Sequence, residues 1–309
     1  MKNTLVLRSL VAAALFAAAA PARAAVDVVA TTEDLASLVR EVGGDRVRVE
    51  ALARGYQDPH FVEAKPSFIL RLNRADLLVL VGRELEVAWL PPLIQQSRNA
   101  KVQRGSPGYL DASLTARILE IPTGQITRAM GDVHPSGNPH YWLDPGNGRR
   151  MAAAIRDRLS QLSPGDAAYF AGRYADFDKR LAAAEARWDA LMKPFRGLDV
   201  VTYHRSWPNF AERFGLEVIG YVEPRPGIPP SPSHTIQLIR EMKSRNVKLL
   251  LVEPYFDLKT PASVARESGA KVVVLLPSVG GEKEVRDYIA LFDHNLDKLV
   301  AAIKETGAR

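Results

Sequence analysis

Three of the six histidines in this chain occupy settings that suit metal chemistry. His60 ends the motif DPH, His140 ends the motif NPH, and His204 follows the apolar run at 198–202. Imidazole is a ligand suited to zinc, copper or nickel, and three imidazoles supply most of a tetrahedral site. A proline before His60 and before His140 stiffens the backbone that carries each ring. The three histidines are therefore predicted metal ligands, although their spacing along the chain does not by itself unite them.

The elements that must position these histidines follow an alternating pattern of strands and helices. Helical patterns or turn signals follow the predicted strands, and this alternation is typical of open parallel sheets. In such sheets, ligands bind beyond the carboxyl ends of the strands, where the segments that carry His60 and His204 begin. The predicted fold class is α/β, with two similar lobes of parallel sheet flanked by helices. The strands are predicted at 26–30, 47–52, 75–81, 198–202, 216–221, 248–252 and 271–275.

A single long helix is predicted between these two sets of strands. It begins at the capping sequence SPGD at 163–166 and ends at Pro194. About 30 residues at 1.5 Å each would span roughly 45 Å, enough to run along both lobes. A coiled-coil dimer is the alternative, but one isolated stripe favours packing against the chain's own lobes. The stripe consists of Phe170, Tyr174, Phe177, Leu181, Ala184, Trp188 and Leu191.

The first 24 residues show the three-part pattern of a secretory signal peptide. Lys2 and Arg8 form the basic start, residues 10–20 form an apolar run, and the small-residue sequence ARA ends at Ala24. We expect cleavage after this alanine. A membrane anchor is the alternative, but the apolar run is shorter than the roughly 20 residues that span a bilayer.

The amino-acid composition limits where in the cell the protein is expected and which partners it is expected to bind. The chain has 309 residues, a net charge of +6 and no cysteine. Part of the basic excess lies in the predicted signal peptide, so the charge predicts no nucleic-acid partner. The lack of cysteine excludes disulfides, thiolate metal sites and a lipid-modified cysteine. We expect a periplasmic protein without a lipid anchor, divided into a signal peptide (1–24), an N-terminal lobe (25–145), a connecting region with the long helix (146–194) and a C-terminal lobe (195–309).

On these residues, the chain resembles the solute-binding proteins of zinc and manganese ABC transporters, and the zinc-uptake binding proteins in particular. The matching segments include NPHYWLDP, VVTYHRSWPNF and LLVEPYFDLKTPASVARESGAKVVVL, and they run from Val28 to about Asp293. The resemblance implies a ligand cleft between two lobes joined by one rigid backbone helix, with metal-ligand roles for His60, His140 and His204. It also implies a monomeric, high-affinity zinc-binding protein that is not an enzyme and delivers its metal to the membrane permease of an ABC transporter.

The resemblance favours Zn²⁺ over Mn²⁺ as the transported ion. Manganese-binding relatives usually carry a carboxylate at the position of His204, and a histidine there makes the site softer. Many zinc-binding members also carry a loop rich in histidine and acidic residues before the second ligand. The corresponding stretch here holds only His134 besides His140, so His134 is predicted as an accessory metal contact at most. Its isolation leads to the hypothesis that a periplasmic metallochaperone supplies the metal.

The fourth metal ligand is the main departure from the family pattern. Leu276 stands where the family usually has an aspartate, and a leucine side chain cannot bind a metal. The site must therefore be completed by water or by another carboxylate. Glu253 follows the strand at 248–252 and is the first candidate, either as the fourth ligand or as a group behind the ligands. Asp257 and Glu84 are weaker candidates.

Two other functions stay open at this point. A zinc ion with an open fourth position resembles a catalytic centre, and Glu253 would be the base of such a zinc hydrolase. The sequence contains no HExxH motif, no G-x-S-x-G elbow and no glycine-rich phosphate loop in support of an enzyme. A binding protein for a metal chelate is the second alternative, and stoichiometric binding of free Zn²⁺ separates it from the favoured function.

Overall fold

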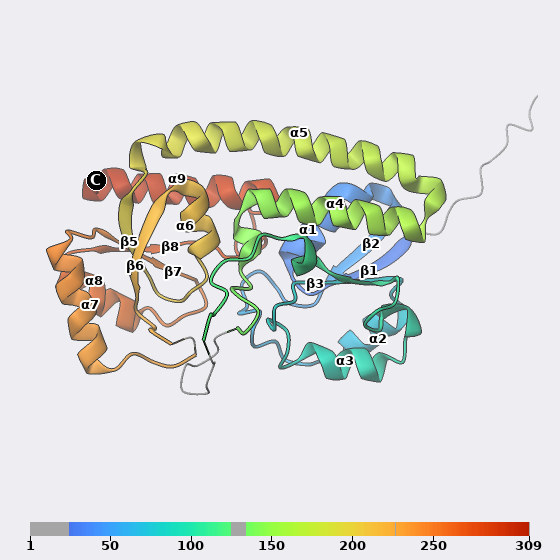
Figure 1. Cartoon of the computed structure of the whole chain (residues 1–309), viewed down its shortest axis with the longest axis horizontal. Coiled ribbons are helices and arrows are strands. Elements are labelled where there is room, and N and C mark those ends of the chain that lie inside the picture. The colour runs from blue at the N-terminus through green and yellow to red at the C-terminus, as the bar shows by residue number, and fades with distance from the viewer. Residues whose placement is uncertain (1–24, 125–133, 226, 309) are drawn as a thin grey trace, which may run out of the picture.

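The computed structural model describes residues 25–124, 134–225 and 227–308. The predicted signal peptide, residues 1–24, lies outside the described residues. Within them, two four-stranded sheets form the centres of two lobes, with the N-terminal lobe on the right of Figure 1 and the C-terminal lobe on the left. The predicted α/β class with two lobes of parallel sheet is confirmed.

The two sheets share one topology. The first has the order β2-β1-β3-β4 and the second has the order β6-β5-β7-β8, and all neighbouring strands are parallel. All seven predicted strands are present with ends shifted by at most two residues, and the short β4 is an addition. The strands are β1 (Val26–Ala30), β2 (Val47–Ala51), β3 (Leu77–Leu80), β4 (Tyr109–Asp111), β5 (Leu198–Thr202), β6 (Leu216–Tyr221), β7 (Leu249–Val252) and β8 (Lys271–Val274).

Helices cover both faces of each sheet. In the N-terminal lobe these are α1 (Glu33–Gly43), α2 (Pro66–Arg74) and α3 (Leu90–Ser97); in the C-terminal lobe they are α6 (Pro208–Phe214), α7 (Pro232–Ser244) and α8 (Lys259–Ser268). Helices α4 (Pro145–Leu162) and α9 (Tyr288–Thr306) lie beneath α5, one over each lobe (Figure 1). The Thr32 hydroxyl caps α1 by accepting a hydrogen bond from the Leu35 amide at 3.4 Å.

The long helix α5 (Ala167–Met192) runs along the top of both lobes in Figure 1. It is shorter than predicted, because residues Pro164–Asp166 form a separate 3₁₀ turn. Its buried face includes most of the predicted stripe, namely Phe170, Phe177, Leu181, Ala184 and Trp188, together with Met192.

One hydrophobic core continues from the first sheet through α4, α5 and α9 to the second sheet. Each sheet also has a smaller core on its outer face, beneath α2 and α3 in one lobe and beneath α7 and α8 in the other. Because the shared core is buried against both lobes at once, separating the lobes would expose apolar surface, and this holds the lobes in place. Among the described residues, no helix is long and apolar enough to cross a membrane.

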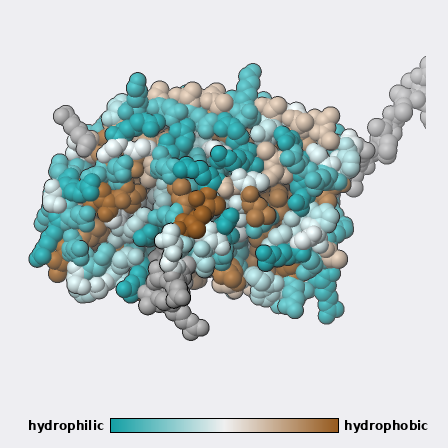
Figure 2. All heavy atoms as spheres, in the orientation of Figure 1, coloured by the Kyte–Doolittle hydropathy of each residue, from teal (hydrophilic) through white to brown (hydrophobic). Residues whose placement is uncertain are grey.

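The face of the molecule drawn in Figure 2 carries many hydrophilic side chains. Figure 2 shows that hydrophobic side chains reach the surface near the middle of one face, between the two lobes. Two strongly exposed apolar side chains, Leu114 and Ile121, belong to the segment that follows β4.

Candidate metal centre

The structure brings His60, His140 and His204 together where the two lobes meet. One ligand nitrogen from each ring lies within 4.8 Å of the other two. The ring centroids are 5.1 to 5.6 Å apart, and all three side chains are buried. A tetrahedral zinc site with Zn–N bonds of 2.0–2.1 Å holds its nitrogens about 3.4 Å apart. The three rings therefore surround a volume of the size that one metal ion occupies.

The histidines come from three different places in the fold. His60 lies in the loop between β2 and α2, and His204 lies two residues after β5. His140 stands directly before the 3₁₀ turn at Tyr141–Leu143. The loop of His60 is held by the Trp89 indole, which donates a hydrogen bond to the Pro59 carbonyl at 3.0 Å. The site thus depends on how the lobes are placed, because no single lobe supplies all three rings.

Close packing between the lobes also positions the loop of His60. Gly55, in this loop, lies against the backbone of the loop at 279–281 from the C-terminal lobe. A Cβ atom at Gly55 would lie 1.9 Å from the Val279 carbonyl oxygen, so only glycine permits this approach.

Each histidine is fixed through the nitrogen that points away from the site. The Nδ1 atom of His60 lies 2.7 Å from Asp58 Oδ1, that of His140 lies 3.0 Å from Asn138 Oδ1, and that of His204 lies 2.6 Å from Glu223 Oε2. An ionised carboxylate or an amide oxygen can only accept a hydrogen bond, so each Nδ1 must carry the proton. In each ring, Nε2 is then the nitrogen whose lone pair is available to a metal.

None of these three partners was predicted from the sequence, although a local signal for two of them is present. In both DPH and NPH, the oxygen of the Asp or Asn side chain also accepts the backbone N–H of the histidine, at 2.9 Å in each case. This is a local turn in which the first side chain of the motif bonds to the chain two residues later. Glu223 has no such local signal, since it lies 19 positions from His204.

Burial and charge act differently on the histidines. Burial lowers the pKa of His140 well below its ordinary value, and the neighbouring histidines add to this effect. Burial also acts to lower the pKa of His204, but the hydrogen bond with Glu223 and the nearby carboxylates outweigh it and raise that pKa. His140 therefore stays neutral to low pH, while His204 takes up a proton more readily than an ordinary histidine.

His134, the predicted accessory contact, lies beside the three histidines. Its Nε2 atom is 3.3 Å from His60 Nε2, but it does not belong to the group whose ligand atoms are all within 4.8 Å of one another. Its loop is held at Ser136, whose hydroxyl donates to Glu84 at 2.7 Å and whose carbonyl accepts from Arg83 at 3.1 Å. Burial lowers the pKa of His134 to about 4, so this ring is neutral at ordinary pH.

The Glu253 carboxylate is fully buried behind His204. Neither of its oxygens has a hydrogen-bond partner of good geometry in the part of the chain that the structure describes. Burial raises its pKa, while the charge of His204 and the Ser206 hydroxyl act in the opposite direction. Glu253 also lies outside the 4.8 Å group, as do Glu84 and Asp257. The Asp257 carboxylate instead accepts a hydrogen bond from the Lys259 amide at 2.8 Å.

Leu276 is buried in the shared core, and its backbone is bonded on both sides by Asn295. The Leu276 amide donates to Asn295 Oδ1 at 2.8 Å, and its carbonyl accepts from Asn295 Nδ2 at 2.7 Å. A charged side chain at this position would have to leave the apolar core. The local environment therefore agrees with the absence of an aspartate here.

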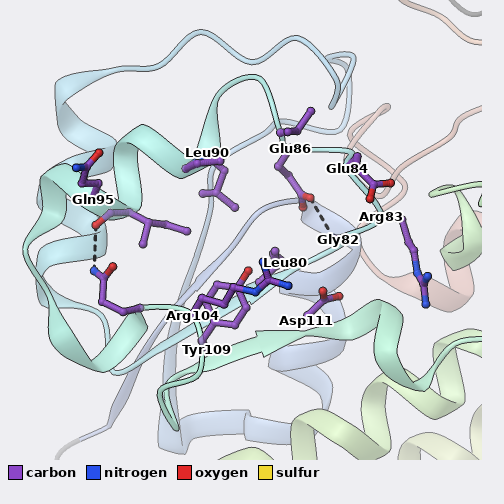
Figure 3. Close-up of a pocket in the computed structure, with 14 residues that line it drawn as sticks. Leu80, Gly82, Arg83, Glu84, Glu86, Leu90, Gln95, Arg104, Tyr109 and Asp111 are labelled. Atoms are coloured by element: carbon purple, nitrogen blue, oxygen red, sulfur yellow. Dashed lines mark hydrogen bonds between the residues drawn. The ribbon is translucent and has the colours of Figure 1, made fainter. Parts of the chain in front are cut away.

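A separate pocket of about 390 Å³ lies in the N-terminal lobe at the ends of β3 and β4 (Figure 3). Its lining includes Glu86, Arg104 and Tyr109, and none of the described lining residues is a histidine. Glu84 stands at its edge and connects it to the loop of His134. This pocket is distinct from the histidine cluster.

The family model described as ZnuA, zinc-uptake complex component A, periplasmic, matches residues 28–302. This chain belongs to that family. The zinc-uptake component A family consists of periplasmic solute-binding proteins, and its members are not enzymes. The resemblance that the sequence suggested is thus confirmed.

Individual relatives match this chain over most of their length and most of its own. The chain is 24% identical to the high-affinity zinc uptake system protein ZnuA of Yersinia pestis, over 98% of this chain and 99% of that protein. It is 29% identical to the ZnuA protein of Paracoccus denitrificans, over 83% and 85% of the two chains. It is also 23% identical to the manganese ABC transporter substrate-binding lipoprotein PsaA of Streptococcus anginosus, over 90% and 89%.

A solved structure shows the same architecture. The crystal structure of ZnuA matches with a TM-score of 0.75 and 26% identity, covering 90% of this chain and 99% of that one. The two parallel sheets and the helix that joins the lobes are thus those of a zinc-uptake binding protein.

Proposed function

We propose that this protein captures Zn²⁺ in the periplasm with His60, His140 and His204 and delivers it to the membrane permease of an ABC transporter. The observation that carries the proposal is that the three rings each bring one ligand nitrogen within 4.8 Å of the other two, while Nδ1 of each ring is bonded to an acceptor. Such a set has the donor type and number of a three-histidine zinc site.

The nitrogen donors favour zinc over manganese. Relatives of this chain include both zinc-uptake proteins and manganese-binding lipoproteins, so the family alone leaves the metal open. Three imidazoles suit Zn²⁺, whereas Mn²⁺ prefers carboxylate, carbonyl and water oxygens. We therefore propose Zn²⁺ as the transported ion and Mn²⁺ as a weaker competitor.

The charge of a buried Zn²⁺ ion would be balanced from behind the histidines. Asp58 and Glu223 accept hydrogen bonds from His60 and His204. Although burial acts to raise the pKa of Asp58, the hydrogen bond and the charge of His60 lower it, so this carboxylate stays ionised. Two carboxylates placed directly behind the ligand histidines stabilise a divalent cation in a buried site without occupying its coordination positions.

Two side chains are candidates for the fourth coordination position. His134 is one candidate, because its Nε2 atom lies 3.3 Å from His60 Nε2. Glu253 supports the site as a buried negative charge next to His204 and would become a ligand only if its side chain moved inward. Water takes the position if neither does.

The remaining proposals follow from the sequence and the family. We propose that residues 1–24 are a cleavable signal peptide and that the mature protein is a monomer without a lipid anchor. Its lobes would be residues 25–145 and 195–309, joined by the region 146–194. A periplasmic metallochaperone is proposed as a metal donor because His134 is the only extra histidine before His140.

Metal titration of the mature protein tests this function. We expect one Zn²⁺ to bind per chain in competition with a chromophoric chelator, and Mn²⁺ to bind more weakly. His60→Ala, His140→Ala and His204→Ala should each weaken zinc binding at least about 100-fold, because each removes one of three ligands. The matched control is His294→Ala, since His294 lies on α9 with a 3.7 Å contact to Glu282. The proposal would be overturned if only the His294→Ala control lost zinc binding, or if the unmodified protein bound no stoichiometric zinc.

A further inference from the structure

Glu120 occupies a backbone conformation that most residues avoid. It lies in the segment between β4 and α4, drawn in green between the two lobes in Figure 1. Its φ angle is 51°, in the left-handed region where a residue other than glycine is strained. Strain of this kind persists only where the surrounding contacts hold it, so the contacts of the Glu120 side chain are informative.

The first of these contacts leads to His140. The Asn138 amide nitrogen donates to Glu120 Oε2 at 2.9 Å and to the Arg205 carbonyl at 2.8 Å. Both amide hydrogens are then used, so the amide oxygen must point the other way, toward His140. That oxygen accepts from the backbone N–H and lies 3.0 Å from Nδ1 of this histidine.

The orientation of Asn138 decides which nitrogen of His140 carries the proton. Asp58 and Glu223 accept hydrogen bonds through either oxygen, whereas an asparagine amide presents a donor instead of an acceptor if it turns over. A turned amide would bond to an unprotonated Nδ1 and place the proton on Nε2, the nitrogen that faces the site. His140 therefore depends on an anchor that His60 and His204 do not need.

The second contact leads to the loop of His204. The Arg205 guanidinium donates to Glu120 Oε1 at 3.0 Å, and it lies over the Tyr221 ring at 4.3 Å from the ring centroid. Tyr221 ends β6 and donates its hydroxyl to the same carboxylate oxygen at 3.4 Å. One carboxylate thus contacts the residue next to His204, the end of a strand in the C-terminal lobe, and the amide that orients His140.

We propose that Glu120 is a positioning residue of the metal centre. It orients His140 through Asn138 and ties this histidine to the loop of His204 through Arg205, so that two ligands from different parts of the fold keep one relative geometry. The inference deepens the proposed zinc function and rests on it. Loss of the Glu120 carboxylate should weaken zinc binding without removing any ligand.

The variant Glu120→Gly separates positioning from folding. Glycine adopts the left-handed conformation without steric cost, so this variant removes the carboxylate while it relieves the strain. The matched control is Glu212→Ala. Glu212 pairs with Arg117 at 2.5 Å, and this pair also ties the segment after β4 to the C-terminal lobe, but it makes no contact with Asn138 or Arg205 among the hydrogen bonds of the described residues.

Zinc competition titration and zinc release rates give the first readout. We expect Glu120→Gly to weaken zinc binding about tenfold or more, within the 10–100-fold range of residues that orient metal ligands, mainly through faster release. Glu120→Gln keeps one acceptor oxygen and should recover part of the affinity. Glu212→Ala should bind zinc as the unmodified protein does.

Nitrogen-15 NMR of the imidazoles in the metal-free protein gives a second readout that a merely structural role would not move. We expect a single Nδ1–H tautomer for His140 in the unmodified protein and a mixture of tautomers in Glu120→Gly, with His60 unchanged. If the unmodified protein binds zinc and Glu120→Gly matches it in affinity and tautomer, the inference about Glu120 is wrong while the zinc function stands. If the unmodified protein binds no zinc, the proposed function fails, and the tautomer experiment alone then decides whether Glu120 orients His140.

Discussion

Two buried glutamates follow the third strands of the two lobes, and they differ in how they are satisfied. Glu86, after β3, accepts hydrogen bonds from the Thr31 hydroxyl at 2.6 Å and from the amides of Val81 and Gly82 at 2.7 and 3.0 Å. Glu253, directly after β7, has no hydrogen-bond partner of good geometry within the described chain, and the charge of His204 and the Ser206 hydroxyl are the groups that act on it. Burial raises the pKa of both, that of Glu86 to about 7.

The comparison separates structural from functional acidic groups. The sheets have the same strand order, and in the N-terminal lobe the end of the third strand is used to close the backbone around a carboxylate. In the C-terminal lobe, the end of the third strand places the Glu253 carboxylate beside a candidate ligand, without a hydrogen-bond partner of good geometry among the described residues. A buried polar group without partners destabilises a fold, so its presence next to His204 agrees with a role toward a bound cation.

Removal of the satisfied glutamate should have the largest effect, and that effect should fall on stability. Glu86→Ala leaves a hydroxyl and two buried amides without their acceptor, so we expect a loss of about 2–4 kcal/mol in the free energy of unfolding. Denaturant unfolding of the metal-free protein measures it. Zinc affinity of the folded fraction should stay unchanged; a large loss of affinity with little loss of stability would reverse the comparison.

The glutamate that bonds a ligand should show the next largest effect. Glu223→Gln keeps an acceptor for His204 Nδ1 but removes the negative charge, so zinc binding at neutral pH should weaken about 10–100-fold. Without that charge, less opposes the effect of burial, so the pKa of His204 falls. Protons then compete with zinc only at lower pH, and the difference between variant and unmodified protein should shrink on acidification.

The same pair makes a linked prediction for stability. Because the folded pKa of His204 is raised, the imidazolium–Glu223 pair stabilises the metal-free protein at pH values below the ordinary histidine pKa, and this contribution is lost as the pH rises through the folded pKa. Glu223→Gln should therefore reduce unfolding free energy at mildly acidic pH more than at alkaline pH. Equal losses of unfolding free energy at acidic and at alkaline pH would show that the pair of His204 and Glu223 does not titrate as described.

Substitution of Glu253 should have a smaller effect, and unlike that of Glu86 it should fall on zinc affinity and not on stability. Glu253→Gln removes a buried acidic group whose oxygens have no hydrogen-bond partner of good geometry among the described residues, so stability should be retained or increased. Zinc affinity should fall by about tenfold or less, since the charge acts from behind His204. Isothermal titration with zinc and denaturant unfolding of the same samples test both parts. A fall in affinity as large as that of His204→Ala would instead identify Glu253 as a direct ligand.

The smallest effect expected is a change of overall shape on zinc binding. The shared core and helix α5 join the lobes, so we expect only local loop movements in place of a wide hinge closure. Small-angle scattering profiles of the metal-free and zinc-loaded protein should overlay. A clear compaction would show that the lobes move as separate bodies.

The parts of this protein that the sequence alone determined are those encoded by near neighbours in the chain. Strand and helix periodicity predicted seven strands and the long helix, and the motifs DPH and NPH contain both a ligand candidate and its hydrogen-bond partner within three residues. The three-residue strand β4 was missed because its pattern is too short to stand out, and its partner β3 lies far earlier in the chain.

The tertiary structure decided the contacts between distant residues. The tripeptide VEP occurs at the end of β6 and again at the end of β7. Both strands lie beside β5, which precedes His204, yet only the first glutamate bonds to His204. Glu120 meets Arg205 across 85 positions of sequence and Asn138 across 18. Such pairings arise from the packing of the two lobes, and no local pattern of residue types specifies them.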